Sequence, residues 1–261
     1  MNNNPLITII TVVYNAVSTI EKTILSVVNQ TYDNVEYIII DGGSTDGTID
    51  IIKKYETQIA NWISEPDKGI YDAMNKGINL ANGEWINFMN AGDSFYENDT
   101  IEKFIELCDD RNGIIYGDSR RFFDVGVYFD RGALSNLDYM PNCHQAFFVK
   151  THLLKSKHFD TNYQICADAK FFCDIHKLGY KYQHIPVVIC NYENTKGLSS
   201  LSKNEKVYFS ELANIEGVNQ TTVKWKVKYL LFVFKLQMKR FIPKKLMNTR
   251  TKRKLDTLCV K

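Results

Sequence analysis

The sequence predicts an α/β fold in which helices flank a mostly parallel central sheet. Residues 6–13 form a continuous apolar, largely β-branched run, typical of a strand buried on both faces of a parallel sheet, and residues 35–40 (VEYIII) predict a second buried strand. Helix-like and strand-like segments then alternate with short connections, a pattern typical of α/β domains. With 261 residues, of which 44% are hydrophobic, the chain is long enough to bury a full core.

Helices are expected between the early strands. The sequence Ser18-Thr-Ile-Glu21 is a capping box and predicts the start of the first helix, in which apolar residues recur on one face. A second helix is expected at about 49–55 and a third at 72–81. Strands are expected at 62–64 and 84–89.

Beyond residue 99 the alternation is looser. This half is expected to cover the sheet and to receive a second substrate. The expected elements are helices at 101–107 and 168–178 and strands at 114–116, 122–129, 146–149 and 182–190.

Cysteine usage and the N-terminus indicate a cellular compartment. Six cysteines are spread along the chain without a C-x-x-C pair, which favours reduced, mostly buried thiols over a disulfide framework or a zinc site. The N-terminus has no basic segment ahead of an apolar one, and no stretch approaches about 18 consecutive apolar residues. We therefore expect a cytoplasmic protein.

The C-terminal segment differs from the rest of the chain in charge. From Lys224 to Lys261 there are thirteen Lys or Arg residues and one acid, Asp256. This tail carries about +12 and residues 1–223 about −10, within a net charge of +2. Basic and apolar residues interleave from Lys224 to Lys245, which predicts a basic amphipathic helix suited to a membrane surface. A helix packed on the domain and an oligomer contact are the alternatives. The acidic body does not favour nucleic acid as a partner.

Polar and acidic residues follow each predicted strand of the N-terminal half. They are Tyr14 with Asn15, and the runs 41–46, 65–69 and 90–93. Ligands of open α/β sheets bind beyond the carboxyl ends of the strands, so these residues predict a ligand site. Turns alone would also favour Gly and Asp at these positions.

Three common ligand motifs do not fit these strand ends. Asp46 and Ile52 stand where an EF-hand loop needs Gly and Glu. No G-x-G-x-x-G follows the first strand and no G-x-x-x-x-G-K-[ST] occurs, which argues against a dinucleotide cofactor and against a P-loop.

Four segments of the N-terminal half together resemble a known family. They are ITIITVVYNA (7–16), VEYIIIDGGSTDGT (35–48), EPDKGIYDAMNKGI (65–78) and GEWINFMNAGD (83–93). In order and spacing they resemble the nucleotide-binding half of the family 2 glycosyltransferases, which have the GT-A (Rossmann-like) fold. His144-Gln145 ahead of an apolar strand, and Cys166-Ala-Asp168 at the start of a helix, extend the resemblance to the second half.

The resemblance implies an inverting glycosyltransferase of the hexosyltransferase type. Its donor would be a nucleotide-diphosphate sugar, with a UDP-sugar expected, and its acceptor a saccharide or lipid-linked saccharide in polysaccharide biosynthesis. The catalytic domain would cover 1–220, with a nucleotide-sugar-binding half at 1–98 and an acceptor-binding half at 99–220. The basic tail would follow at 221–261. Such an enzyme would be cytoplasmic, or peripheral on the inner face of the cell membrane.

The resemblance also implies a donor and metal site. Asp93 corresponds to the last acid of the family's D-x-D-type motif, where Mn²⁺ or Mg²⁺ would neutralise the diphosphate. This chain departs from the motif, with Asn90 in place of its first acid and Gly92 where another acid is common. The residues implied in nucleotide binding are Tyr14, Asn15, Asp41, Asp67, Lys68, Asn90 and Ala91.

Asp168 is the general base that the resemblance implies. It would deprotonate the acceptor hydroxyl, which then attacks the anomeric carbon opposite the nucleotide. Capping of its own helix is an alternative role, and the two roles are compatible. His144 and Gln145 would contact the acceptor or the diphosphate, although a lone histidine is as often structural.

Two other functions are compatible with the sequence. A nucleotidyltransferase can share an α/β core, but it would have a Gly-rich, basic loop after the first strand, and residues 14–18 have neither property. A catalytically inactive sugar-nucleotide-binding protein is the other alternative. Asn90 and Gly92 favour it, whereas the retained acids count against it.

Overall fold

The computed structural model describes residues 4–123, 126–130, 143–193 and 201–220, and beyond them residues 222, 225, 227 and 230. The chain divides into two compact units. The large unit comprises Met1–Arg120 and Phe129–Tyr192, and the small unit comprises Arg121–Tyr128 and Glu193–Lys261. All of the predicted site residues belong to the large unit.

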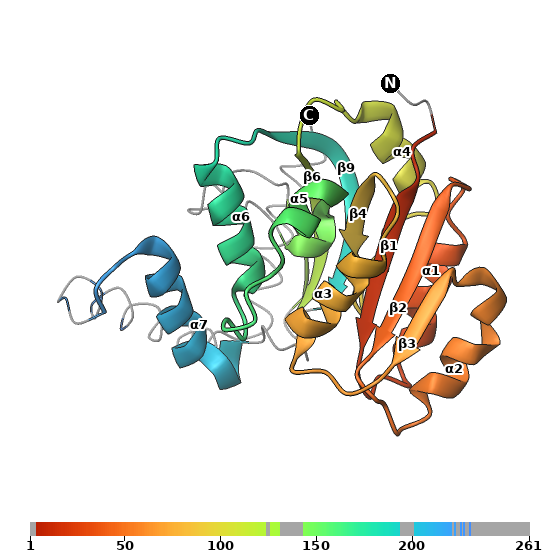
Figure 1. The fold of residues 1–261 in the computed structure, drawn as a ribbon, viewed down its shortest axis with the longest axis horizontal. Helices are drawn as coiled ribbons and strands as arrows, with labels where there is room; N and C mark the ends of the chain where they lie inside the picture. The colour runs from red at the N-terminus through yellow and green to blue at the C-terminus, as the bar shows by residue number, and fades with distance from the viewer. Residues whose placement is uncertain are drawn as a thin grey trace. The chain divides into compact units, whose positions relative to one another are not determined.

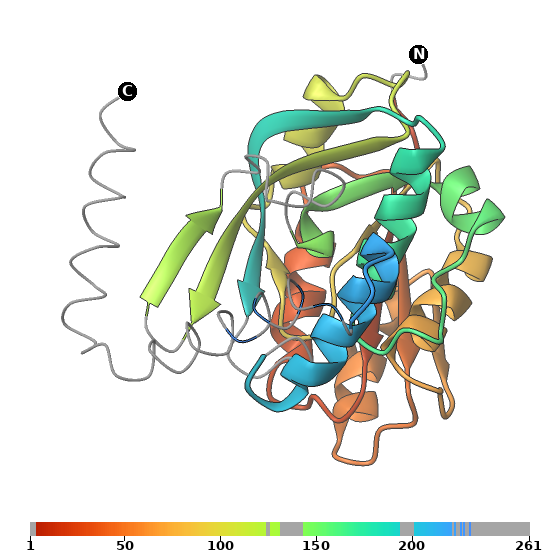
Figure 2. The same ribbon diagram turned by 90° about the vertical axis from the view of Figure 1, so that its left-hand side faces the viewer.

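Strands of the described residues form one mixed sheet, in the order β3-β2-β1-β4-β8-β6-β9-β5 with β7 beside β6 (Figure 1). Figure 2 shows that the long strand β9 is strongly curved. The strands are β1 (Ile7–Val13), β2 (Val35–Asp41), β3 (Asn61–Ser64), β4 (Trp85–Phe88), β5 (Ser94–Phe95), β6 (Ile114–Phe123), β7 (Gly126–Asp130), β8 (Phe147–Lys150) and β9 (Tyr182–Glu193).

Helices connect most of these strands. Those expected from the sequence are present with ends shifted by a few residues, while α5, α7 and the two 3₁₀ turns were not predicted. The helices are α1 (Ile20–Val28), α2 (Thr48–Lys54), α3 (Ile70–Leu80), α4 (Thr100–Leu107), α5 (Thr151–Ser156), α6 (Ala167–Lys177) and α7 (Leu201–Glu216), with 3₁₀ turns η1 (Glu56–Gln58) and η2 (His144–Ala146).

The parallel part of the sheet aligns the ends of its strands. β1 pairs in parallel with β2 and β4, and β2 with β3. Val13 lies opposite Asp41, and Asp41 opposite Ser64, so three strands end at one edge of the sheet. β8 is antiparallel to β4 and β6, and β5 is antiparallel to β9. The predicted parallel sheet is thus confirmed up to β4, and antiparallel pairs follow it.

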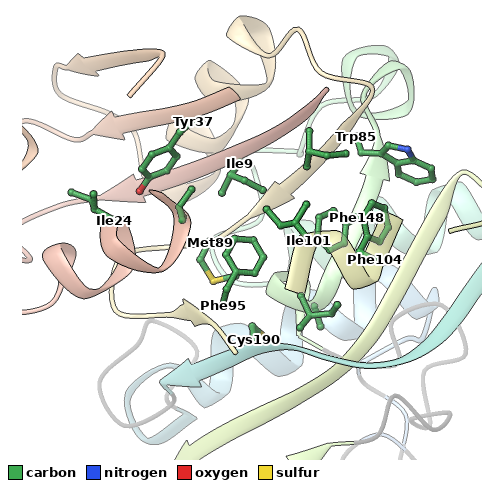
Figure 3. Close-up of a cluster of buried hydrophobic side chains, with 14 of the residues drawn as sticks. Ile9, Ile24, Tyr37, Trp85, Met89, Phe95, Ile101, Phe104, Phe148 and Cys190 are labelled. Carbon is green, nitrogen blue, oxygen red and sulfur yellow. The ribbon is translucent and has the colours of Figure 1, made fainter. Parts of the chain in front are cut away.

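Both faces of the central strands are covered, as their continuous apolar sequences predicted. Ile9 and Ile39 belong to a buried cluster that includes residues of α1, α2 and α4 (Figure 3). Ile10 and Ile38 belong to a second cluster with residues of α3, α5 and α6. Burying one such side chain stabilises the fold by about 1.5–3 kcal/mol, so these two layers hold the strand ends in place.

The first helix begins differently from the capping-box prediction. Thr19, not Ser18, is the N-cap residue, and it makes no side-chain cap hydrogen bond. The N–H groups of Thr19 and Ile20 donate to the Ala16 carbonyl, both at 2.9 Å. Side chains of the β2–α2 loop accept hydrogen bonds from residues just ahead of the helix, and this long-range support replaces the local cap. The donors are the N–H groups of Asn15, Ala16 and Val17, and the acceptors are Ser44, Thr48 and Asp46.

The small unit contains α7 and the start of the predicted tail. Trp225 is buried and its ring lies 5.9 Å from that of Phe209 on α7. The first aromatic residue of the tail is therefore packed within its own unit. Apart from 222, 225, 227 and 230, the predicted amphipathic segment 221–261 lies outside the described residues. Among the residues that are described, no helix is long and apolar enough to cross a membrane.

Candidate active site

The loop after β2 is built around a buried carboxylate. Asp41 has no exposed surface. Its Oδ2 accepts hydrogen bonds from the N–H groups of Gly43 and Ser44 and from the Ser64 hydroxyl, at 3.1, 2.9 and 2.6 Å, and its Oδ1 accepts one from the Ser44 hydroxyl. In this arrangement the Asp41 carboxylate holds the turn together. Its predicted contact with a nucleotide base stays a prediction.

Asn15 joins the ends of β1 and β2. It adopts φ +47°, a left-handed conformation that asparagine tolerates better than most residues. Its N–H donates to Ser44 Oγ at 2.7 Å, and its Oδ1 accepts from the Thr45 N–H at 2.9 Å. Asn15 therefore fixes the two loops relative to each other and leaves the neighbouring Tyr14 side chain 63% exposed.

Tyr14 and Asp67 flank Gly42, and we name these three residues the Gly42 notch. A Cβ on Gly42 would collide with Asp67 Oδ2 and lie 3.3 Å from the Tyr14 ring. Asp67 Oδ1 accepts from the Gly69 N–H at 2.8 Å, which orients its carboxylate at the start of α3. The notch therefore places an aromatic face and a carboxylate oxygen side by side. Lys68 follows with an exposed side chain.

The loop after β4 contains residues 90–93, which correspond to the predicted metal motif. The Ala91 N–H donates to the Val12 carbonyl at 3.2 Å, which ties the loop to β1. Asp93 and Asn90 are both buried. Gly92 has φ +103°, a conformation strained for any residue with a side chain.

His144 and Gln145 reach this loop from η2. Gln145 Nε2 donates to Asp93 Oδ2 at 2.6 Å. His144 Nε2 lies 3.0 Å from Asn90 Nδ2, and its Nδ1 lies 2.9 Å from Asp168 Oδ2. Five predicted site residues are thus joined by hydrogen bonds, and we name them the polar cluster. They are Asn90, Asp93, His144, Gln145 and Asp168.

Asp168 does not have the capping role that was its alternative. It is the second residue of α6, and Cys166 is the N-cap residue. Asp168 Oδ1 accepts from the Ala169 N–H at 2.8 Å and from the Tyr71 hydroxyl at 3.0 Å. Its side chain is 11% exposed, so the carboxylate is largely buried.

Contact with Asp168 shifts the pKa values of His144, a member of the polar cluster, and of the neighbouring Tyr71. Burial works to lower the pKa of His144, but the hydrogen bond and negative charge of Asp168 outweigh burial and raise that pKa above its usual value. Burial, followed by the charge of Asp168, raises the pKa of Tyr71 well above its usual value. Tyr71 therefore stays a protonated donor at any working pH.

Oxygen atoms suited to a hard cation lie around Asp93. Asn90 Oδ1 and Gln145 Oε1 are buried and have no hydrogen-bond partner among the described residues. One carboxylate and two amide oxygens fit Mg²⁺ or Mn²⁺ when phosphate oxygens complete the coordination. In the described part of the chain, no group of three or more His, Cys, Asp or Glu side chains could hold a metal ion. Binding of a cation at Asp93 would therefore depend on the amide oxygens of Asn90 and Gln145.

Two features of the site were missed from the sequence. The first is the His144–Asp168 pair, whose members are 24 positions apart. The second is Tyr71, which we had read only as part of the segment 65–78. The signal for it was present, because Tyr71, Asn75 and Asn79 recur at intervals of four and form a polar stripe on a helix.

Comparison with known proteins places the chain in a family. The glycosyl transferase family 2 model matches residues 8–178, about two thirds of the chain. The chain belongs to glycosyl transferase family 2. The predicted family is thus confirmed, and the match spans both the Gly42 notch and the polar cluster.

Several curated relatives of this family 2 glycosyltransferase are bacterial. A PGL/p-HBAD biosynthesis glycosyltransferase of Mycobacterium bovis is 32% identical over 209 residues, covering 75% of this chain and 80% of the relative. An uncharacterized glycosyltransferase of Haemophilus influenzae is 40% identical over 104 residues, covering 39% of this chain and 41% of that protein.

Solved structures confirm the GT-A fold. A mannosyltransferase from Pyrobaculum calidifontis in complex with GDP-Man and Mn²⁺ matches with a TM-score of 0.64 at 20% identity. TarS residues 1–349 of S. aureus, in complex with UDP-GlcNAc, match with a TM-score of 0.65 at 17% identity. Each match covers 80% of this chain, which spans just under two thirds, 64% and 65%, of those two chains. At such identities the likeness concerns the fold.

Proposed function

We propose that this family 2 glycosyltransferase moves a sugar, with inversion, from a UDP-sugar to a saccharide or lipid-linked saccharide in glycan biosynthesis. The observation that carries the proposal is the polar cluster, which places the Asp168 carboxylate in one hydrogen-bonded network with His144, Asn90, Asp93 and Gln145. A base on one side of the anomeric carbon and a stabilised diphosphate on the other is the arrangement that inversion requires.

Asp168 has the acceptor capacity of a general base. An ionised carboxylate offers about four lone-pair positions. Oδ1 uses two of them for Tyr71 and Ala169, and Oδ2 uses one for His144. The remaining position on Oδ2 would accept the proton of the acceptor hydroxyl. Because three donors hold the carboxylate, this lone pair has a fixed direction.

The Gly42 notch would receive the nucleotide base. The exposed Tyr14 ring offers a stacking face, and Asp67 Oδ2 faces Gly42 as an acceptor. A carboxylate oxygen accepts from an imino N–H, which uracil, thymine and guanine have and cytosine lacks. UDP is the nucleotide that we propose. The solved structures of similar fold were obtained with UDP-GlcNAc and with GDP-Man, so both enter the test.

Asp93, Asn90 and Gln145 would hold a divalent cation through their oxygen atoms. A cation bound there would act as a Lewis acid for the diphosphate leaving group.

The test is nucleotide release from a panel of UDP-, GDP- and dTDP-sugars, with and without Mn²⁺. The assay needs no known acceptor, because water can take the acceptor's place. We expect Mn²⁺-stimulated release from a UDP-sugar, lost in Asp93→Asn and kept in Asp99→Asn, whose carboxylate pairs with Lys103. If no donor is hydrolysed and none raises the melting temperature at about 100 times a typical dissociation constant, where binding adds about 2.7 kcal/mol, the proposal is wrong.

A further inference from the structure

Tyr71 is a buried polar residue that the proposed reaction does not yet use. It lies on the first turn of α3 and is 6% exposed. Its hydroxyl lies 2.6 Å from the Ile165 carbonyl and 3.0 Å from Asp168 Oδ1, so its single hydrogen is shared between the two acceptors. A hydroxyl buried against a carboxylate on another helix is suited to holding that carboxylate in one orientation.

Tyr71 belongs to the polar stripe of α3, which binds the segment ahead of α6. Asn75 makes two hydrogen bonds to the backbone of Phe159, both at 2.9 Å. Asn79 Oδ1 lies 2.8 Å from His158 Nε2. The rings of Tyr71 and Phe159 lie 5.5 Å apart, and Phe159 is also 5.5 Å from Phe171 of α6. Polar and aromatic contacts therefore fix Tyr71 relative to α6.

We propose that Tyr71 is a positioning residue that aims the Asp168 carboxylate at the acceptor hydroxyl. The inference rests on the proposed function, in which Asp168 is the base. Tyr71 and the Ala169 N–H both bond Oδ1, and this leaves Oδ2 to His144 and the acceptor. Without the hydroxyl, Oδ1 keeps only the adjacent backbone donor. The carboxylate can then rotate and its accepting lone pair loses its direction.

Helix α3 connects the carboxylate of Asp168 with the loop of Asp67, which would contact the nucleotide. Asp67 lies four residues before Tyr71, and the Asp72 N–H donates to Gly69 at 3.0 Å at the start of α3. The loop of Asp67 and the hydroxyl of Tyr71 thus occupy one end of one helix. Helix α3 therefore holds Tyr71, which would orient the catalytic carboxylate, close in sequence to Asp67, which would contact the nucleotide base.

The groups that can titrate around Asp168 come from three elements. Tyr71 faces it from α3 and His144 from η2, and the Cys166 thiol lies on the chain ahead of α6. Asp93 and Cys143 act on His144 in turn. A change in the pH–rate profile after substitution of Tyr71 alone, with these other groups retained, would report the hydrogen bond to Asp168.

The test compares Tyr71→Phe with Tyr182→Phe in nucleotide release from the UDP-sugar that the panel identifies. Tyr182 is the matched control, because its hydroxyl donates to the Phe172 carbonyl of α6 at 2.8 Å and does not touch Asp168. For Tyr71→Phe we expect kcat to fall about tenfold to a hundredfold, with the donor KM changed less than about twofold. The pH dependence of its kcat should differ from that of the wild type, because one of the donors that hold the Asp168 carboxylate is lost. Tyr182→Phe should match the wild type.

The pH profile keeps the test decisive, because it does not depend on how much of the protein is folded. A Tyr71→Phe enzyme with wild-type kcat and profile would overturn the inference, as would an equal loss in both variants with no change of profile. Asp168→Asn separates the two proposals. If Asp168→Asn is inactive while Tyr71→Phe is normal, only the positioning role fails. If Asp168→Asn is active, the proposed base itself is wrong.

Discussion

The loops of the donor side and the polar cluster are built in different ways. On the donor side, Asp41 and Asn15 make their hydrogen bonds to the backbone and hydroxyl groups of two adjoining loops. In the polar cluster, side chains from the loop after β4, from η2 and from α6 bond one another, and Tyr71 of α3 bonds Asp168 from outside the cluster. The donor side is therefore a local scaffold that presents Tyr14 and Asp67, whereas the cluster exists only when distant segments meet. Substitutions in the two regions should have different effects.

The largest effect is expected in the polar cluster. Asp168→Asn removes the proposed base but keeps its volume, so transfer should fall by about 10²–10⁴ with little change in melting temperature. Asp174→Asn, on the same helix and paired with Lys157 and Lys170, is the control and should keep its activity. Initial rates of nucleotide release measure both. Comparable activity in Asp168→Asn and the wild type would remove the cluster's proposed role.

A second prediction compares two acids of the donor side. Asp41→Asn should lower the free energy of unfolding by about 3 kcal/mol, because it disturbs a buried carboxylate that accepts several hydrogen bonds. Asp67→Asn should leave stability within about 0.5 kcal/mol and raise the donor KM about tenfold. Urea unfolding and donor titration measure the two quantities. If Asp41→Asn were stable and Asp67→Asn unstable, the assigned roles would have to be exchanged.

The smallest effect concerns the pH dependence of stability. The pKa of His144 is raised in the folded protein, so the charged pair with Asp168 stabilises the fold below the ordinary histidine pKa of about 6.5. That stabilisation is lost as the pH rises through the raised value. His144→Gln should therefore destabilise the protein by about 1 kcal/mol near pH 6 and by less near pH 8.5. Thermal melts across this range measure it. His184→Gln, which removes a more exposed partner of Asp118, is the matched control variant.

The sequence predicted the strands ahead of residues 14–15 and 41–46 well, because the information for them is local. The strand-forming runs that end at Val13 and Asp41 specify β1 and β2. Because these two strands pair in parallel, their carboxyl ends lie side by side. The family resemblance implied that Asp41 contacts the nucleotide, and in the fold its carboxylate is buried inside the turn. Burial of an acid by its own loop depends on the turn's three-dimensional path, which residue types alone do not specify.

The polar cluster was predicted as residues but not as an arrangement. Asp93, His144 and Asp168 were each singled out, yet nothing in their spacing indicated that His144 would bond Asn90 and Asp168 at once. Pairing of this kind depends on where β8 and α6 lie against the parallel strands. The role of Tyr71 depends on the docking of α3 against the segment ahead of α6, a tertiary contact whose partner the polar stripe of α3 does not identify.

The stereochemistry of transfer tests the central proposal most directly. With an α-linked UDP-sugar that the donor panel identifies, NMR can detect the anomer released to water before mutarotation. A base at Asp168 that activates the attacking hydroxyl opposite the nucleotide predicts the β anomer as the first product. Initial release of the α anomer would contradict inversion and the role proposed for Asp168.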